Sequence, residues 1–162
     1  MSLAQAPLER CTKQGFDEIV RDNDDFWEAG RTPRLLHPMF VFEFGDTAFV
    51  IRDGERVAAY LFGVLATASP TAYVHLVAVR HAHRGQGLGR RLYEHFLEVG
   101  RSRGARRAKA ITSPHNAASI AFHERLGFHA VGDGEGTTPV VRDYSGPGVD
   151  RVVLVRDLTV GV

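Results

Sequence analysis

One stretch of the sequence decides the fold class, Val79-Arg80-His81-Ala82-His83-Arg84-Gly85-Gln86-Gly87-Leu88-Gly89. The segment before it, 72–79, is apolar on both faces, as expected of a central strand that is covered on two sides. After it, Leu88, Leu92, Phe96 and Val99 recur at helical spacing, which predicts an amphipathic helix. The stretch is therefore predicted to be a glycine-rich connection from a buried strand to a helix.

Such a connection is suited to binding phosphate. Glycine lets the backbone approach a bulky anion and adopt positive φ, and the first N–H groups of a helix attract negative charge. Arg84 and Arg90 would add positive charge. The spacing is neither the dinucleotide fingerprint nor a P-loop, because no Gly-Lys-Ser/Thr follows. A phosphate-binding loop is the prediction, and a glycine-rich turn without a ligand is the alternative.

The elements upstream of this stretch predict an antiparallel meander. Strand formers fill 47–52 and 57–66, and Asp53-Gly54 between them is a strong hairpin signal. Ser69-Pro70 marks the turn into the strand at 72–79. Further elements are expected nearer the N-terminus: a short strand at 8–11, a helix over 13–24 capped by Thr12, and a broken helix within 26–45.

Downstream, strands and helices alternate. The helix that begins near Leu88 is expected to end at Gly104, and a second helix is expected to open at Pro114 and Asn116 and to stop at Gly127. The remaining predictions are strands at 108–112, 128–131 and 152–157, and a long glycine-rich loop at 132–148. The pattern predicts one domain over residues 1–162, with a mixed α/β fold.

Composition excludes several classes of protein. The 162 residues carry a formal net charge of +1, from 20 basic and 19 acidic residues, which argues against a nucleic-acid partner. No apolar run reaches the roughly 18–20 residues of a membrane span, so no membrane association is expected. The lone Cys11 cannot form an internal disulfide, and Met1–Pro7 lacks the pattern of a secretory signal. We therefore expect a cytoplasmic protein.

The glycine-rich stretch resembles the signature of the GCN5-related N-acetyltransferases, a strand ending in Val followed by Arg-x-x-Gly-x-Gly. A second pattern similar to that family begins at Asn116 and continues through Ser119-Ile120-Ala121-Phe122-His123-Glu124-Arg125-Leu126-Gly127-Phe128. The two motifs cover residues 72–131. The resemblance implies the acyl-CoA N-acyltransferase fold, in which helices flank a central, mixed, mostly antiparallel sheet. It also implies transfer of an acetyl group from acetyl-CoA, the co-substrate, to a primary amine of a small molecule or peptide.

The resemblance assigns cofactor contacts residue by residue. The diphosphate would lie against the loop formed by Arg84, Gly85, Gln86, Gly87, Leu88, Gly89 and Arg90. The backbone of Val77, Ala78 and Val79 would pair with the pantetheine arm as an added strand does, and one of its N–H groups would polarise the thioester carbonyl. Asn116 would hydrogen-bond the same arm.

Two positions depart from the family pattern. His123 stands where relatives often have a tyrosine acid, seven residues after Asn116 and on the same helix face. It could protonate the leaving thiolate or merely pack there, and a thiol pKa near ~8.5 makes an acid dispensable. Ile111 stands where several relatives have a glutamate base. His75 is then the leading candidate for the base, followed by Glu43 and His115, with a water chain as an equal alternative.

Other signals are weaker. His81 and His83, with His75, lack a recognisable ligand set, so no metal is expected. The basic run at 101–109 suggests a solvated helix end or a contact to the 3′-phosphate of CoA. The loop carrying Tyr144 could close an acceptor site.

The acceptor amine cannot be identified from the sequence, and a homodimer is left open because similar proteins are commonly dimers. The rival function is a non-catalytic acyl-CoA sensor, and a third reading is transfer of a longer acyl chain.

Overall fold

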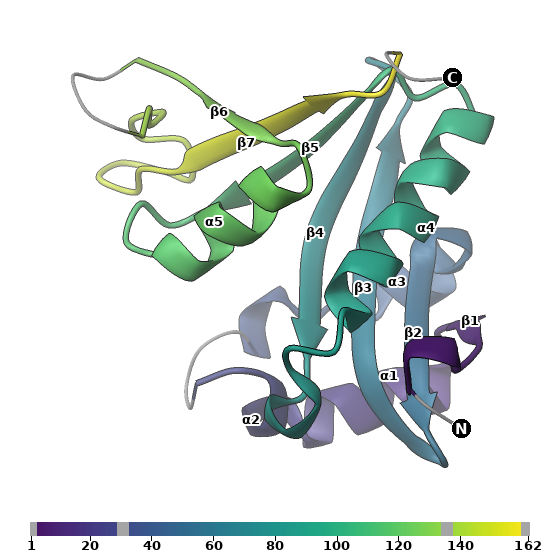
Figure 1. The fold of residues 1–162 in the computed structure, drawn as a ribbon. Coiled ribbons are helices and arrows are strands. Elements are labelled where there is room, and N and C mark those ends of the chain that lie inside the picture. The colour runs from purple at the N-terminus through teal and green to yellow at the C-terminus, as the bar shows by residue number, and fades with distance from the viewer. Residues whose placement is uncertain (1–2, 29–32, 134–137, 160–162) are drawn as a thin grey trace.

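The computed structural model describes residues 3–28, 33–133 and 138–159 (Figure 1). Its centre is a seven-stranded sheet in the order β1-β2-β3-β4-β5-β7-β6. All neighbouring strands are antiparallel except β4 and β5, which are parallel. This confirms the predicted mixed, mostly antiparallel sheet. The strands are β1 Leu8–Arg10, β2 Ala48–Asp53, β3 Arg56–Ala66, β4 Thr71–Val79, β5 Arg107–Thr112, β6 His129–Val131 and β7 Val152–Asp157.

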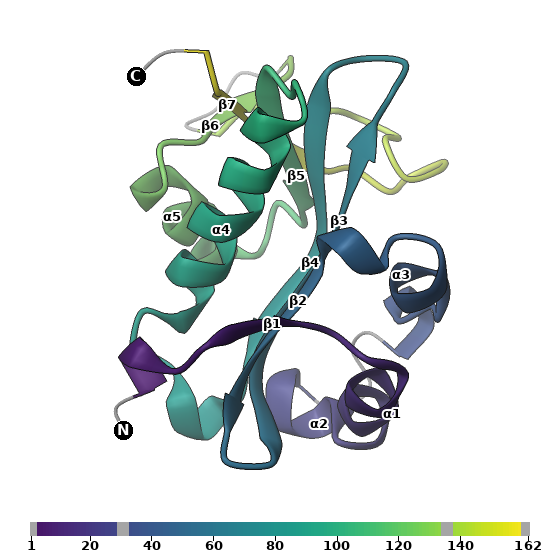
Figure 2. The same cartoon turned by 90° about the vertical axis from the view of Figure 1, so that its right-hand side faces the viewer.

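Helices cover both faces of the sheet. Figure 2 shows α4 and α5 on one side and α1, α2 and α3 on the other. The α-helices are α1 Lys13–Arg21, α2 Asn23–Phe26, α3 Met39–Phe42, α4 Leu88–Ser102 and α5 Ala117–Arg125. Four 3₁₀ turns complete the described elements: η1 Leu3–Gln5, η2 Pro33–Leu35, η3 Gly45–Thr47 and η4 His81–His83.

The N-terminal helix differs from its predicted form. Thr12 caps it as expected, since its Oγ1 accepts from the Gly15 N–H at 3.2 Å. The predicted helix over 13–24 is, however, interrupted at Asp22, which caps α1 and precedes α2. The broken helix predicted within 26–45 is present as η2, α3 and η3, while residues 29–32 lie outside the described residues. In the loop predicted at 132–148, residues 134–137 lie outside as well.

Two hydrophobic clusters lie on the two faces of the sheet. Because side chains alternate along a strand, Phe49 and Ile51 of β2 join the cluster beneath α4, while Ala48 and Val50 join the cluster beneath α1 and α3. The third strand of the meander, β4, also contributes to both clusters, as its apolar pattern predicted. None of the described helices is long and apolar enough to cross a membrane.

A β-bulge at His75 shapes the functional part of the sheet. Gly63 of β3 pairs with Val74, but Phe62 pairs with Leu76, so His75 is an extra residue in β4. Beyond the bulge, β4 separates from β5. The two strands pair only where Thr71–Tyr73 faces Arg107–Lys109, near the start of both. The rest of β4 therefore has a strand neighbour, among the described residues, on its β3 side alone.

Candidate active site

A cleft of about 800 Å³ lies where β4 and β5 separate. Its walls come from both faces of the sheet. Tyr93 of α4 and Ser119 and His123 of α5 line one end, while Trp27 and Arg34 line the other. The remaining lining residues are Leu35, Tyr73, Val74, His75, Leu76, Val77, Ala110, Ile111, Thr112, Ser113, Asn116, Ser145 and Arg151. The cleft thus joins the two faces through the gap in the sheet.

The glycine-rich loop precedes α4 and fits an anion. Gly85 and Gly87 have φ of 77° and 78°, values that favour glycine, and a Cβ at either would meet nothing within 4 Å. The first intrahelical bond of α4 runs from the Arg91 N–H to the Gly87 carbonyl at 3.1 Å. The N–H groups at the start of α4 therefore have no acceptor within the helix. Such an open backbone surface is suited to an anion, and phosphate binding by this loop stays a prediction.

The two arginines of the loop are already engaged by protein groups. Arg84 donates from Nη2 to the Phe26 carbonyl at 2.8 Å and from Nε to the Val79 carbonyl at 3.4 Å. Arg90 pairs with Glu94 one turn along α4, at 2.7 Å. Arg84 thus braces the loop against the end of α2. The geometry favours main-chain N–H groups over guanidinium groups as the principal anion contacts.

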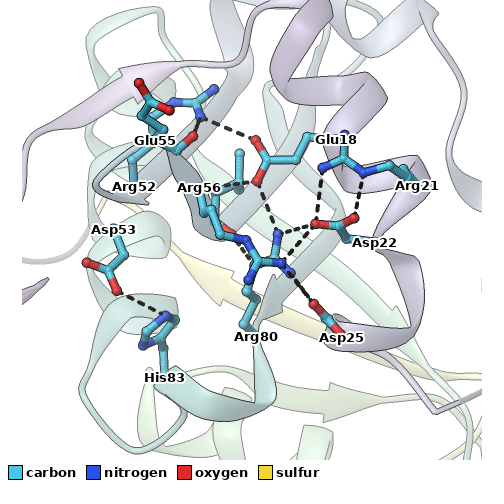
Figure 3. Close-up of polar contacts among 11 residues, drawn as sticks. Glu18, Arg21, Asp22, Asp25, Arg52, Asp53, Glu55, Arg56, Arg80 and His83 are labelled. Atoms are coloured by element: carbon cyan, nitrogen blue, oxygen red, sulfur yellow. Dashed lines mark hydrogen bonds and ion pairs between the residues drawn. The ribbon is translucent and has the colours of Figure 1, made fainter.

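The segment leading into this loop begins with a buried arginine that was not predicted as functional. Arg80 is 4% exposed and pairs with the carboxylates of Glu18 and Asp22, at 3.1 and 2.8 Å, and with that of Asp25 (Figure 3). The acidic residues recur at helical spacing in the sequence, and that stripe is the signal that could have revealed the cluster. We call Arg80, Glu18, Asp22 and Asp25 the Arg80 cluster.

The Arg80 cluster also satisfies backbone groups at a second bulge. The register of β2 against β3 shifts between Ile51 and Arg52. There the Val57 N–H donates to Glu18 Oε1 at 2.7 Å, and the Val57 carbonyl accepts from Arg80 Nε at 2.6 Å. The guanidinium lies 4.6 Å from the centroid of the Phe26 ring. The cluster therefore fastens α1 and α2 to the sheet beside the glycine-rich loop.

The edge of β4 that faces the cleft has backbone groups without a strand partner. Arg80 N–H donates to the Ala58 carbonyl of β3. Because N–H and C=O groups alternate sides along a strand, the Ala78 backbone also points toward β3, and those of Val77 and Val79 point toward the gap. Of the three residues predicted to pair with the pantetheine arm, Val77 and Val79 have the required orientation, and Ala78 lies between them.

His75 lies in the cleft, and one of its ring nitrogens has no hydrogen-bond partner among the residues that the structure describes. Its Nε2 is 2.9 Å from the Leu35 carbonyl, which can only accept, so Nε2 carries the proton and Nδ1 keeps its lone pair. The ring stacks on Phe40 with centroids 4.6 Å apart. Burial lowers the pKa of His75, opposed in part by the bond to Leu35. The ring is therefore neutral at pH 7, with a free acceptor.

His123 lies in the same cleft with both nitrogens occupied. Its Nδ1 donates to the Ser119 carbonyl at 2.7 Å, so Nε2, 2.5 Å from the Tyr93 hydroxyl, accepts that O–H. Burial is the main cause that lowers the pKa of His123, and burial raises that of Tyr93. To act as an acid, His123 would have to hold a second proton and break the bond from Tyr93. Tyr93 was not predicted from the sequence, although Gly89, Tyr93 and Phe96 share one face of α4.

The other predicted residues lie in different surroundings. Asn116 lines the cleft and caps α5, with Oδ1 accepting from the Ser119 N–H at 3.1 Å, which leaves its amide N–H groups for a ligand. Glu43 and His115 are exposed and do not line the cleft.

Cys11 is buried, and burial raises the pKa of its thiol to about 12, which disfavours a nucleophilic role. Within the described ranges no group of His, Cys, Asp and Glu could hold a metal ion.

The loop that carries Tyr144 was predicted to close the acceptor site. Residues other than Tyr144 bring this part of the chain to the cleft. Ser145 and Arg151 line the cleft, whereas the ring of Tyr144 lies 5.1 Å from Lys109 Nζ. Isolated bridges join Asp133 to Val140 and Val141 to Arg151. The described part of the loop is therefore attached to the start of β7 at the mouth of the cleft.

Comparison with known proteins finds relatives that are named as acetyltransferases. The chain is 29% identical over 98 residues to N-alpha-acetyltransferase 30 of Schizosaccharomyces pombe, covering 59% of this chain and 65% of that protein. It is 25% identical over 131 residues to the L-2,4-diaminobutyric acid acetyltransferase of Shouchella clausii, covering 76% and 71%. Thus the chain spans about two thirds of the length of these curated relatives.

A solved structure shows the same fold. The structure of yncA from Salmonella typhimurium, determined with its cofactor acetyl-CoA, superposes with a TM-score of 0.69 at 19% identity, over 98% of this chain and 96% of that one. The model of the Acetyltransferase (GNAT) family matches residues 13–128, which include the glycine-rich loop, the open edge of β4 and all of α5. The chain therefore belongs to the acetyltransferase (GNAT) family.

Proposed function

We propose that the protein transfers an acetyl group from acetyl-CoA to a primary amine of a small molecule or peptide. One observation carries the proposal: the amides that begin α4 and the unpaired edge of β4 at Val77 are both open and follow each other along the chain. The first surface suits a diphosphate, and the second suits an extended arm. Support comes from the family and from relatives named as an N-alpha-acetyltransferase and a diaminobutyric acid acetyltransferase.

The residues of the cleft would divide the work of the reaction. Acetyl-CoA supplies an acyl carbon open to attack by the amine nitrogen and a sulfur that leaves with the bonding electrons. The Val77 N–H is directed into the gap, where it can donate to an oxygen that gains negative charge. His75 can accept the amine proton at Nδ1, because its ring is neutral and held by Leu35 and Phe40.

His123 and Tyr93, the pair that contains the predicted acid, are poorly placed to protonate the leaving sulfur. Tyr93 already donates to His123, and burial keeps the Tyr93 hydroxyl protonated. We therefore propose that the sulfur leaves as a thiolate, which a thiol pKa near ~8.5 permits, and that His123 holds α4 against α5 through Tyr93. An acid role for His123 is the alternative. It would be supported if a His123→Gln variant lost the alkaline limb of its pH–rate profile.

Calorimetry with CoA and pantetheine tests the proposal. CoA carries the diphosphate and pantetheine does not, so CoA should bind at least about tenfold more tightly if the loop holds the diphosphate. Thiol release from acetyl-CoA in the presence of mixed amines then reports turnover. Absence of heat with CoA would refute the proposal. Tight binding without thiol release with any amine would favour the acyl-CoA sensor.

A further inference from the structure

The two faces of the sheet give the two ends of the cleft different roles. The glycine-rich loop leads directly into the first residues of α4, so a diphosphate held there lies on the side of the sheet covered by α4 and α5. Figure 2 shows α3 and the yellow-green segment before β7 on the opposite side of the sheet. Arg34, between α2 and α3, and Arg151, just before β7, line the cleft there. If the proposed function holds, the amine acceptor enters from this second side.

The acceptor end of the cleft is positively charged. Arg34 and Arg151 are its charged lining residues, and the described lining contains no aspartate or glutamate. Within the described ranges neither arginine forms an ion pair; the guanidinium of Arg151 donates only to the backbone carbonyl of Asp150, at 2.9 Å. This differs from Arg80, Arg90 and Arg103, which all pair with carboxylates.

The neighbouring carboxylates are occupied by the loop itself. Asp150 Oδ1 accepts from the Asp143 N–H at 2.9 Å, and Asp143 Oδ1 accepts from the Gly148 N–H at 2.6 Å. These bonds shape the turn that ends at Arg151. On the other wall, the Leu35 carbonyl is held by His75 Nε2, which fixes the segment carrying Arg34 next to the candidate base. Both arginines are thus placed by local structure, and neither forms an ion pair with a described carboxylate.

A site of this charge selects among amines. A diamine or a lysine-rich peptide would bring positive charge toward two arginines, which is unfavourable. An amine with a carboxylate would pair with a guanidinium, which binds carboxylates through two parallel hydrogen bonds. No described carboxylate lines the cleft to hold the amine as ammonium, so His75 can take its proton. A volume of about 800 Å³, shared with the thioester end, suits a small molecule.

We propose that the acceptor is a small amino carboxylate, whose carboxylate is bound by Arg34 and Arg151 and whose amine faces His75. The inference rests on the proposed function and specifies its substrate class. A peptide acceptor, with its carboxylate far from the amine or absent, is the competing outcome.

The experiment compares matched acceptors. The common amino acids and the diamino acids are assayed with acetyl-CoA beside their carboxamides, simple diamines, and peptides with a free N-terminus and an amidated C-terminus. We expect kcat/KM for the preferred amino acid to exceed that for its carboxamide by at least about tenfold. Equal rates for acid and amide, or a preference for diamines or amidated peptides, would overturn the inference and leave the proposed function standing.

Variants locate the carboxylate site. Arg151→Gln and Arg34→Gln should each raise KM for the amino acid about 10- to 100-fold, raise KM for the carboxamide far less, and leave KM for acetyl-CoA unchanged. Arg142→Gln is the matched control, because Arg142 is exposed in the same loop and does not line the cleft. An unchanged KM in both test variants would contradict the assignment.

A binding measurement covers the case in which no acceptor is acetylated. The amino acids are titrated by calorimetry into protein saturated with CoA. Heat that is lost in Arg151→Gln supports the carboxylate site. If CoA binds but no amino carboxylate binds or reacts, the inference fails. If CoA itself does not bind, the proposed function fails first.

Discussion

The arginine of the Arg80 cluster and the arginines at the acceptor end of the cleft differ in burial and in their carboxylate partners. Arg80 is 4% exposed and meets three carboxylates, a backbone carbonyl and an aromatic face. Arg34 and Arg151 line a cleft and meet no carboxylate among the described residues. Removing a charge from water is costly, so a buried charge needs partners from the protein. The first region is complete without a ligand, and the second can gain from a ligand that brings negative charge.

The largest expected effect is on folding stability. Arg80→Met would leave Glu18 and Asp22, both largely buried, without their shared cation, and should lower the free energy of unfolding by about 3 kcal/mol. Arg56→Met is the matched control. Arg56 pairs with Asp22 and Asp25, but its side chain is 64% exposed, so the loss should stay below about 1 kcal/mol. Urea denaturation measures both. Equal losses would show that burial does not distinguish the two arginines.

The next effect is on turnover. His75→Gln keeps a group that can donate to Leu35 but removes the titrating nitrogen, so kcat should fall about 100-fold and the acidic limb of the pH–rate profile should disappear. Because burial lowers the pKa of His75, that limb in the parent protein should lie below pH 6.5. If the pH–rate profile of the variant resembled that of the parent protein, water and not His75 would be the base.

A smaller effect is expected on CoA affinity. Gly87→Ala places a Cβ at φ 78°, which strains the loop by about 1–2 kcal/mol, and should weaken CoA binding about tenfold. Gly104→Ala is the matched control. It has a similar φ of 85° and open space around its Cβ, but it follows the far end of α4. Calorimetry should find CoA affinity changed in the first variant alone, and a change in both would mean that strain acts through α4 as a whole.

The smallest effect concerns stability in acid. Burial lowers the pKa of His123 below 6.5, so the unfolded chain takes up a proton more readily than the folded one. Stability is therefore full well above pH 6.5 and declines as pH falls toward and below it, by at most about 1.4 kcal/mol at pH 5.5. His123→Phe should flatten this slope, whereas His129→Gln, at an exposed position, should not. Urea midpoints at several pH values measure the difference.

The fold was largely predictable because its signals are local. Apolar periodicity gave the meander and α4, and the Asp53-Gly54 turn and the glycine-rich stretch gave the connections. The prediction of one continuous N-terminal helix was wrong at Asp22. This residue caps α1, and its carboxylate accepts hydrogen bonds from Arg80, Arg56 and Arg21. The acidic residues of the Arg80 cluster share one helix face, but the local sequence does not show which remote arginines they bind or where the helix is interrupted. The same holds for Gly63, where a Cβ would lie 2.5 Å from the Phe96 ring of α4.

The candidate site was only partly predictable. The loop at 84–90 and the strand at 77–79 follow from one motif, and the structure places Val77 in the cleft and the loop between β4 and α4. The different hydrogen bonding of His75 and His123 does not follow from the motif. Whether a ring nitrogen is free depends on partners remote in the sequence, such as Leu35 and Tyr93. Arg34 and Arg151 are far apart in sequence and line one cleft only after the sheet has formed.

By itself, the sequence determined the order of strands and helices, the family resemblance and the position of the phosphate loop, since each is encoded by neighbouring residues. Only the tertiary structure decided where β4 leaves β5, which histidine keeps a free nitrogen and which arginines lack a carboxylate. Those properties depend on burial and on hydrogen bonds between elements remote in the chain, and both arise when the two faces of the sheet are packed.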